Sequence, residues 1–258
     1  MNSSPNAPAA VDIRGASKTY PNGTRALEPI DLTVREGEFV TIVGPSGCGK
    51  STLLRLIAGL SAPSTGDISL SPGFTPPRLA YVFQSPTLMP WANVRANVRL
   101  PLDLAGMARS EAEQATDHVL DLVGLQECAR AFPRELSGGM QMRVSIARAL
   151  ATGPRLLLMD EPFGALDEIT RNRLDREISE LSARENLTVL FVTHSIYEAV
   201  FLSSRVLVMS PRPGHIAGEV AIDAPRPRRA AFRNMPEFFA RSAQLSEMLG
   251  AAMTEAAQ

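Results

Sequence analysis

Residues 44–51 read GPSGCGKS, and this stretch decides how the rest of the chain is interpreted. It follows an apolar run, Phe39–Val43, and precedes a short apolar helical pattern at 51–60. The pattern G-x-x-x-x-G-K-[ST] is typical of a phosphate-binding loop, whose glycines let successive backbone N–H groups face one anion at a helix start. Lys50 adds a compact positive charge, and Ser51 can offer a hydroxyl to Mg²⁺. The sequence therefore predicts a nucleotide phosphate site between a strand and a helix.

Three further apolar runs, at 79–83, 156–159 and 189–192, resemble the first one. Their continuous apolarity is typical of strands that are buried on both faces of a parallel sheet. A helical pattern at 168–185 carries apolar residues on one side and charges on the other. Strands that alternate with helices predict a wound α/β sheet.

Two regions do not follow this alternation of strands and helices. Residues 12–37 alternate between apolar and polar, which favours an antiparallel sheet with one wet face. Residues 94–152 read as mostly helical, with breaks near Gly106 and Pro133, and we interpret them as a helical subdomain inserted into the main domain. The expected organisation is a disordered tail at 1–10, one domain at 11–225 with its helical subdomain at about 87–153, and a linker and C-terminal helical tail at 226–258. The run 225–229 (PRPRR) is interpreted as solvated linker.

The bulk composition restricts the class of protein. The 258 residues are 45% hydrophobic and 21% charged with a formal net charge of −1, so nothing indicates a nucleic-acid surface. Cys48 and Cys128 lie far apart, which argues against a disulfide framework or a cysteine metal site. No stretch approaches the roughly 18 apolar residues of a membrane-spanning helix. If the protein acts at a membrane, we expect another chain to cross it.

Polar residues follow every predicted strand. Gln84 follows the second strand, Asp160 and Glu161 follow the third, and Thr193 and His194 follow the fourth. Ligands bind at the carboxyl ends of strands in open α/β sheets, so we expect these side chains to share one site with the phosphate loop. Taken alone, two carboxylates after a strand are as often a helix cap, and a solitary histidine is more often structural. The phosphate loop favours the functional interpretation of both.

A second anion site is predicted at Ser137. Ser137 precedes a helical pattern and suits an N-cap, and Gly138 and Gly139 expose backbone N–H groups at the positive end of that helix. A simple capped helix is the alternative interpretation of this stretch.

Together these segments resemble the ATP-hydrolysing subunits of ABC transporters. The matching segments are 44–52, Gln84, 136–140, 156–162, 165–167 (Ala165 to Asp167) and His194, and the match in order and spacing extends over about residues 11–220. The resemblance implies an α/β fold, with a P-loop NTPase (RecA-like) parallel sheet core, an N-terminal antiparallel β subdomain and an inserted α-helical subdomain. It also implies ATP hydrolysis with ATP and Mg²⁺.

The resemblance implies a role for each matching residue. ATP would be bound by the Walker A residues Gly44, Pro45, Ser46, Gly47, Cys48, Gly49, Lys50, Ser51 and Thr52, by Ser137, Gly138 and Gly139 of the signature, by Asp167 of the D-loop and by Tyr20 against adenine. Catalysis would involve Glu161 as base, His194 on the γ-phosphate and Gln84 as sensor. The metal ligands would be Ser51, Gln84 and Asp160.

The resemblance also implies partners. In the family, the signature of one subunit closes over the γ-phosphate that the Walker A loop of a second subunit holds, so we expect a homodimer with two sandwiched ATP molecules. We further expect membrane permease chains, an extracytoplasmic solute-binding protein, no nucleic acid, and a peripheral position on the cytoplasmic face of the inner membrane. Residues 84–108 resemble the importer branch that handles nitrate, sulfonates and taurine.

One departure and several alternatives accompany this prediction. The family's usual signature has glutamine where this chain has Met140, followed by Gln141. A non-transport ABC ATPase of DNA repair or translation is the alternative function, but neither a coiled-coil insertion nor a tandem domain is visible. A GTPase would need an Asn-Lys-x-Asp guanine reader, and neither Lys18 nor Lys50 has an aspartate two residues later.

Four smaller expectations complete the sequence analysis. Leu88, Met89 and Trp91 are predicted to line the groove that receives the permease. Cys48 is expected to be either a reactive thiol or a small filler of the phosphate loop. Tyr20 could alternatively pack on the sheet. His118 and His215 are interpreted as structural.

Overall fold

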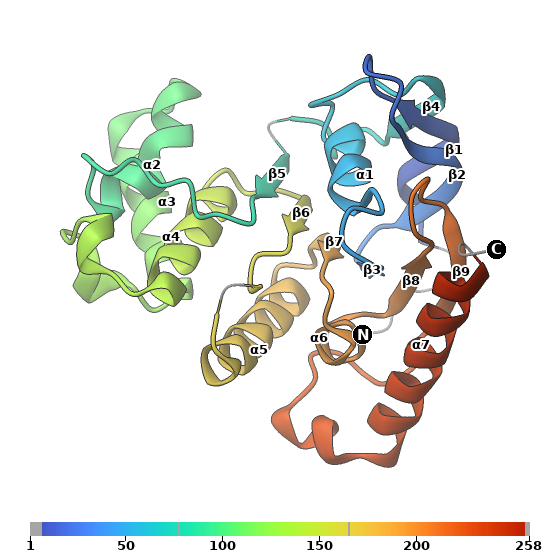
Figure 1. The fold of residues 1–258 in the computed structure, drawn as a ribbon. Helices are drawn as coiled ribbons and strands as arrows, with labels where there is room; N and C mark the ends of the chain where they lie inside the picture. Colours follow the sequence, from blue (N-terminus) through green and yellow to red (C-terminus); the bar gives the residue numbers. More distant parts are fainter. Residues whose placement is uncertain (1–6, 77, 165, 256–258) are drawn as a thin grey trace.

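The computed structural model describes residues 7–76, 78–164 and 166–255 (Figure 1). Within them, a six-stranded sheet has the order β5-β6-β7-β3-β8-β9, in which every neighbouring pair is parallel except β8 and β9. Its strands are β3 (Phe39–Val43), β5 (Leu79–Val82), β6 (Leu156–Asp160), β7 (Thr188–Val192), β8 (Arg205–Met209) and β9 (Ile216–Ala221). The four predicted strands are therefore confirmed, and β8 and β9 extend the sheet beyond them.

The central strands are buried on both faces because each supplies side chains to two separate cores. In β3, Phe39 and Val43 pack into one core and Val40 and Ile42 into the other. Helix α1 (Lys50–Ile57) lies in the second core, on the same side as the antiparallel sheet. Helices α2 to α7 contribute to the first core. This alternation explains why the strands read as continuous apolar runs.

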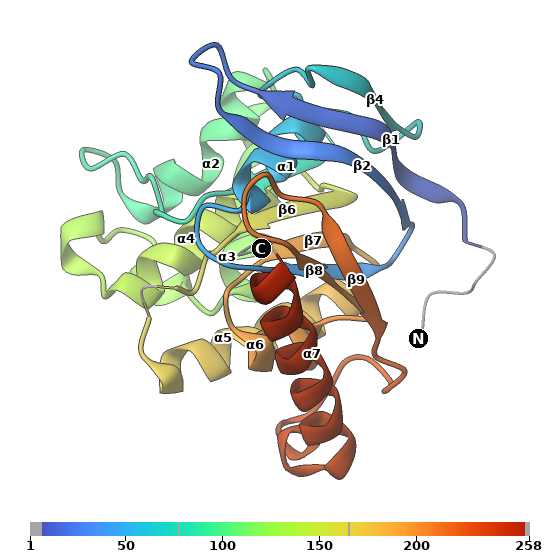
Figure 2. The ribbon, with the colours of Figure 1, turned by 45° about the vertical axis from the view of Figure 1, so that its right-hand side comes forward.

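The antiparallel sheet covers α1 and has the strand order β2-β1-β4 (Figure 2). Its strands are β1 (Ala9–Thr19), β2 (Arg25–Arg35) and β4 (Thr65–Leu70). Strand β1 begins at Ala9, and Ala10 is fully buried, so the last residues of the segment expected to be a disordered tail (1–10) belong to the sheet. Residues 1–6 of that segment lie outside the described residues.

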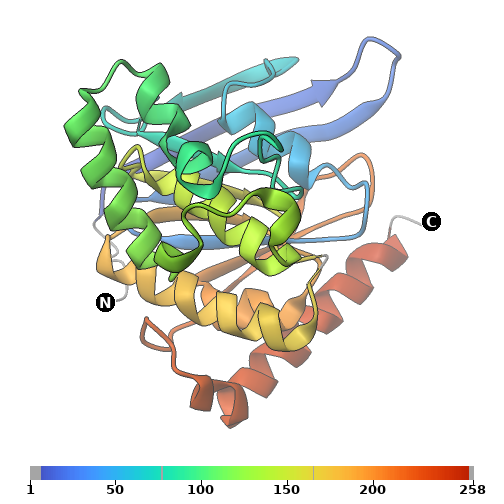
Figure 3. The ribbon, with the colours of Figure 1, turned by 90° about the vertical axis from the view of Figure 1, so that its left-hand side faces the viewer.

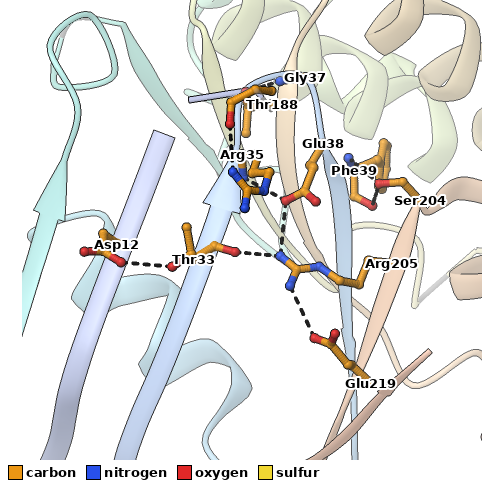
Figure 4. A network of polar contacts seen from close by, with 11 residues as sticks. Asp12, Thr33, Arg35, Gly37, Glu38, Phe39, Thr188, Ser204, Arg205 and Glu219 are labelled. Atoms are coloured by element: carbon orange, nitrogen blue, oxygen red, sulfur yellow. Dashed lines mark hydrogen bonds and ion pairs between the residues drawn. The ribbon is translucent and has the colours of Figure 1, made fainter. Parts of the chain in front are cut away.

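Arg205 of β8 joins the two sheets (Figure 4). Its guanidinium donates to the backbone carbonyl of Thr33 in β2 at 2.6 Å and to Glu38 at 3.1 Å, and it pairs with Glu219 of β9 at 3.2 Å. Glu38 in turn accepts a hydrogen bond of 2.7 Å from the Arg35 backbone N–H. Because a guanidinium carries several donors in fixed directions, one side chain can hold three strands in register.

A helical subdomain stands between β5 and β6, as the sequence predicts. It contains α2 (Val94–Leu104), α3 (Arg109–Leu122) and α4 (Gly138–Leu150), with the short 3-10 turns Gln126–Cys128 and Pro133–Glu135. Helix α2 ends before Gly106, and α4 begins after the turn at Pro133, so both expected breaks are present. Figure 3 shows these green helices in front of the sheet, beside α5 (Glu168–Arg184). The predicted fold class is confirmed.

The C-terminal segment follows β9 back across the domain. It contains η3 (Ala230–Asn234) and the 20-residue helix α7 (Pro236–Glu255), which contacts α6 (Ile196–Leu202), β8 and β9. The expectation of solvated linker at 225–229 is wrong for two of its arginines. Arg226 is 7% exposed and Arg228 is 3% exposed.

Arg228 is buried because the fold gathers backbone carbonyls around its guanidinium. It donates to the carbonyls of Val200, Phe201 and Ser203 at the end of α6, and to those of Ile222 and Ala224 after β9. A positive charge suits the C-terminal end of a helix, where carbonyls lack partners within the helix. Burial lowers the pKa of Arg228 to about 9, with the neighbouring Arg226 as a second cause.

Candidate functional site

The phosphate loop connects β3 to α1, so that α1 begins at Lys50 directly behind the loop. Gly49 occupies the N-cap with φ of 109°, a conformation that side chains rarely adopt. A Cβ atom at Gly49 would also lie 2.6 Å from Leu27 and 2.8 Å from the carbonyl oxygen of Ala26. Glycine is therefore required here both for the backbone curl and for the close packing of the loop on β2.

Lys50 is buried inside the curl of the loop. Its side chain is 4% exposed, and its ammonium donates to the carbonyls of Gly44 at 2.8 Å and Pro45 at 2.9 Å. The same ammonium lies 3.6 Å from a carboxylate oxygen of Glu161. A buried ammonium group needs hydrogen-bond acceptors or a counter-charge. Phosphate oxygens of a bound nucleotide could replace these carbonyls and this carboxylate, or bind beside them.

Cys48 is a small filler of the loop. Its side chain is 1% exposed, and burial raises the pKa of its thiol. Its sulfur lies 3.0 Å from the position that a Cβ at Gly44 would take. A buried, protonated thiol is a poor nucleophile, so of the two expectations the packing role is the one that the geometry favours.

Asp160 ends strand β6 opposite the start of α1. Its Oδ1 accepts a hydrogen bond of 2.7 Å from the Ser51 hydroxyl. Its Oδ2 accepts one of 3.0 Å from the phenol of Tyr81 on the neighbouring strand β5. Tyr81 is not among the predicted site residues, although a tyrosine that interrupts a buried apolar strand is a usable signal. Burial, and then Asp160, raise the pKa of that phenol, so it remains a donor.

The Ser51–Asp160 pair fits a magnesium ion. Mg²⁺ is usually held through one or two carboxylates, waters and substrate phosphates instead of a complete protein cage. Within the described part of the chain, no group of three or more His, Cys, Asp or Glu side chains could hold a metal alone. A hydroxyl and a carboxylate 2.7 Å apart beside the phosphate loop supply the oxygen donors that this ion prefers.

Glu161 is the centre of the predicted catalytic group. Its carboxylate lies 3.6 Å from Lys50, 3.4 Å from the amide nitrogen of Gln84 and 3.6 Å from Nδ1 of His194. The backbone of Glu161 has φ of 47°, which is uncommon for a residue with a side chain and costs about 1–3 kcal/mol. Such strain clusters at functional sites, and here it turns the carboxylate toward the ends of β3, β5 and β7. The expected convergence of these four residues is therefore present.

Ser137 and the following glycines are placed elsewhere. Ser137 caps α4 by accepting a hydrogen bond of 3.3 Å from the Met140 N–H, as predicted. Among the described residues, no hydrogen bond or ion pair joins residues 137–139 to the loop 44–49. A Cβ at Gly139 would lie 2.7 Å from the methyl group of Thr170 at the start of α5. The second anion site therefore packs beside α5, and in Figure 1 helix α4 lies well apart from α1.

The signature's departure from the family pattern has a local explanation. Met140 packs against the first core. Gln141 turns its amide back to donate to the carbonyls of Pro133 at 3.0 Å and Leu136 at 3.3 Å. The amide side chain thus holds the turn that precedes Ser137 in place.

Asp167 and Tyr20 flank the site. Asp167 is exposed and caps α5, and the hydrogen bond from the Thr170 backbone N–H lowers the pKa of its carboxyl. The Tyr20 phenol lies 3.1 Å from the Thr52 hydroxyl at the start of α1, and the Lys18 ammonium is 5.5 Å from its ring. Tyr20 is therefore beside the phosphate loop, where an aromatic base could stack. Ala165, which belongs to the matching motif, lies outside the described residues.

The predicted permease groove contains an exposed tryptophan. Trp91 is 76% exposed, while Leu88 and Met89 are half-buried. Asn97 holds this loop through hydrogen bonds with the Met89 backbone, and Arg148 holds its start through the carbonyls of Pro86 and Thr87. A cavity of about 420 Å³ opens between β5, α2 and α4, and 79%-exposed Leu104 lies at its rim. No described helix has the length and apolarity to cross a membrane.

Comparison with known proteins assigns a family to these features. Residues 27–164 match the ABC transporter family. The chain is 44% identical to the nitrate import ATP-binding protein NrtD of Synechocystis, over 89% of this chain and 90% of that protein. It is also 44% identical to the bicarbonate transport ATP-binding protein CmpC of Synechococcus elongatus, over 85% of this chain and 34% of that protein.

Solved structures agree with the sequence comparison. A dimeric bacterial ABC transporter cassette has a TM-score of 0.73 and 32% identity, over 83% of this chain and all of that chain. The same cassette has been solved in a post-hydrolysis state bound to ADP and Pi, with the same TM-score and coverage.

Proposed function

Because this chain belongs to the ABC transporter family and is an ATP-binding ATPase of that family, we propose that it powers a separate permease by closing and reopening as a dimer around ATP. The observation that carries the proposal is the division of the phosphate-binding groups between two places. Lys50 and Glu161 form one group, and Ser137 and Gly139 lie beside α5, without a bond to the loop. One copy is therefore incomplete, and a second copy would complete each site.

Each residue of the site has a proposed role. Lys50 and the loop N–H groups bind the β- and γ-phosphates, and Ser137 with Gly138 of the second copy closes over the γ-phosphate. Ser51, Asp160 and Gln84 would hold Mg²⁺, which would neutralise charge that develops on the phosphates. Asp167 lies at the interface between the two copies, and Tyr20 stacks on adenine.

Hydrolysis depends on the attacking water. Glu161 orients this water and accepts its proton, and the strained backbone of Glu161 aims the carboxylate at the phosphate loop. His194 and Gln84 both approach the Oε2 atom of this carboxylate, and their proposed role is to contact the γ-phosphate. Loss of that phosphate removes the ligand that joins the two copies, so the dimer reopens.

The transported solute is proposed to be a small solute of the nitrate, sulfonate or taurine kind. The similarity to proteins named for nitrate import and bicarbonate transport supports import of a small oxyanion. The exposed Trp91 and the mainly apolar cavity between β5, α2 and α4 are proposed to receive the permease. An extracytoplasmic binding protein would then deliver the solute to the permease.

The Glu161→Gln variant tests the ATPase part of the proposal. It keeps the shape of the side chain but removes the proton acceptor, so ATP should still bind while kcat falls by about a thousandfold, equivalent to about 4 kcal/mol. ATP should then trap a stable dimer, measurable by size-exclusion chromatography with light scattering. A variant that hydrolyses ATP at the native rate, or remains monomeric with ATP, contradicts the proposal.

Replacement of the gene in its host by the Glu161→Gln gene tests the transport part. Uptake of labelled nitrate, taurine and bicarbonate is compared between cells that carry the native gene and cells that carry the Glu161→Gln gene. Loss of uptake for one of these solutes identifies the solute class. Unchanged uptake of all three would exclude the proposed solutes without affecting the assignment of the ATPase.

A further inference from the structure

A group of four charged residues lies behind the nucleotide-facing loops. It consists of Arg171 and Asp175 on α5, Glu198 on α6, and Arg233 on η3 in the C-terminal segment. We call it the charge cluster. It lines a cleft of about 540 Å³ between α5, α6 and α7.

The deepest pair of the cluster ties the C-terminal segment to α5. Asp175 is completely buried, and its Oδ2 accepts a hydrogen bond of 2.5 Å from Arg233. Its Oδ1 accepts no hydrogen bond from any described residue. The Arg233 guanidinium also lies 4.1 Å from the ring centre of Phe201 on α6. A buried carboxylate with a single cationic partner depends strongly on that partner, because removing it leaves an uncompensated charge.

The other pair connects two loops of the ATPase site. Glu198 is 5% exposed and lies 3.2 Å from Arg171. The guanidinium of Arg171 also donates to the carbonyl of Leu166, the residue before Asp167, at 2.9 Å. On its other side, Glu198 accepts a hydrogen bond from the hydroxyl of Thr193, the residue before His194. Arg171 and Glu198 therefore connect the loop before Asp167 with the turn that carries His194.

The two pairs belong to one electrostatic unit. Burial raises the pKa of both Asp175 and Glu198; the charge of Glu198 adds to this effect at Asp175, whereas Arg171 and Arg233 oppose it at both carboxyl groups. Each carboxyl group of the cluster has one guanidinium group as its direct partner. Without Arg233, Asp175 would lose its hydrogen-bonded cation. Arg171, which contacts Glu198, would then be the remaining guanidinium group of the cluster for both carboxyl groups.

Aromatic packing adds a second connection from the same segment. The rings of Tyr197 and Phe238 are stacked at 5.8 Å, and Phe238 also meets Phe232 edge-on at 5.6 Å. Tyr197 precedes Glu198 on α6, whereas Phe232 precedes Arg233 on η3. The same two segments are thus joined both by charge and by ring contacts.

We propose that the charge cluster positions the loop before Asp167 and the turn of His194 for ATP hydrolysis, so that the C-terminal segment controls the ATPase rate through Arg233. The residues of the cluster are positioning residues, since they act through their neighbours. The proposal rests on the roles given above to Asp167 and His194, but not on the identity of the solute or of the permease.

The first test uses the full-length chain and compares three variants. Arg233→Ala should lower kcat by about tenfold while KM for ATP changes by less than about twofold, because the loops and not the nucleotide contacts are disturbed. Arg233→Lys should recover most of the rate, since it restores the charge. Arg229→Ala is the matched control, because Arg229 is an exposed arginine on the same segment, and this variant should match the native rate.

A second test separates positioning from folding. Glu198→Gln keeps a side chain of the same shape and removes only the charge facing Arg171, so it should fold and also lose about tenfold in kcat. The double variant with Arg233→Ala should be no slower than the slower single variant, because residues that act as one unit are not additive.

Specific outcomes would overturn the proposal. These are a native kcat in both single variants, additive losses in the double variant, or a loss of rate that only parallels the loss of folded protein by circular dichroism. His194→Ala is assayed in parallel. If it retains the native kcat, the proposed role of His194 fails, and the effect of Arg233→Ala still reports separately on the cluster.

Discussion

The phenol of Tyr81 donates a hydrogen bond of 3.0 Å to Asp160, from the strand beside the one that Asp160 ends. With the Ser51 hydroxyl on the other oxygen, both carboxylate oxygens of Asp160 are oriented by a donor. Groups behind a ligand set its direction and tune its affinity for metal. Tyr81 is thus part of the site although it would not touch nucleotide or metal.

Tyr81→Phe should lower the apparent affinity of the site for Mg²⁺. The variant keeps the ring but leaves one oxygen of Asp160 without its donor, so the Mg²⁺ concentration for half-maximal ATPase rate should rise by about tenfold. At saturating Mg²⁺ the rate should approach the native value. Tyr197→Phe is the matched control, since Tyr197 is 58% exposed. Identical Mg²⁺ curves for Tyr81→Phe and the native chain would refute the role.

Gly139→Ala should destabilise the fold through a contact inside one chain. The added methyl would lie 2.7 Å from the Thr170 methyl group, and overpacking of this kind costs about 1–3 kcal/mol. The free energy of unfolding, measured in urea, should fall accordingly. Adding Thr170→Ser removes the opposing methyl and should restore most of the loss. If it restores nothing, the clash is not the cause.

Trp91→Ala should uncouple the subunit from its permease. Because Trp91 is 76% exposed, the free energy of unfolding should change by less than about 0.5 kcal/mol, and the ATPase rate of the isolated chain should be native. Solute uptake and co-purification with the permease should fall. Leu60→Ala, at a 60% exposed site after α1, should have no such effect. Coupled transport in Trp91→Ala would exclude this surface.

Asp175 should make stability fall as the pH rises. Burial, followed by the charge of Glu198, raises the pKa of Asp175 to about 7 against the opposing effect of Arg233 and Arg171, compared with 3.8 when exposed. Between these values the folded chain holds a proton that the unfolded chain has lost, so the free energy of unfolding decreases with pH by at most about 1.4 kcal/mol per pH unit.

Asp175→Asn should flatten that slope in urea unfolding between about pH 5 and pH 7, because asparagine does not titrate. Asp67→Asn is the control, as Asp67 is exposed on β4, and it should keep the native slope. A slope in Asp175→Asn equal to that of the native chain would show that Asp175 titrates at an ordinary pH when folded.

Local patterns carried most of the predictable information. Strand β3 has the predicted limits because its apolar run, interrupted only by Thr41, is bounded by the turn at Gly37 and by the phosphate loop. Strand β8 was not predicted because its apolar residues follow those of α6 with only Ser203 and Ser204 between them. No change in hydrophobic periodicity therefore marks where the helix ends and the strand begins. The approach of Glu161, Gln84 and His194 was predictable because parallel strands end at one edge.

Contacts made by long side chains could not be predicted in this way. A run of arginines between prolines has the composition of solvated chain, and only the folded backbone supplies the carbonyls that bury Arg228. The pairing of Arg171 with Glu198 likewise depends on how α5 meets α6. Neither contact can be inferred from the spacing of residues along the chain.

The five carbonyls around Arg228 have a practical consequence for work with this family. A fragment trimmed at residue 225 would remove Arg228 and leave these buried backbone carbonyls without hydrogen-bond donors. Such a fragment should precipitate during expression. A domain limit placed before Arg226 would therefore cut through the interior of this protein.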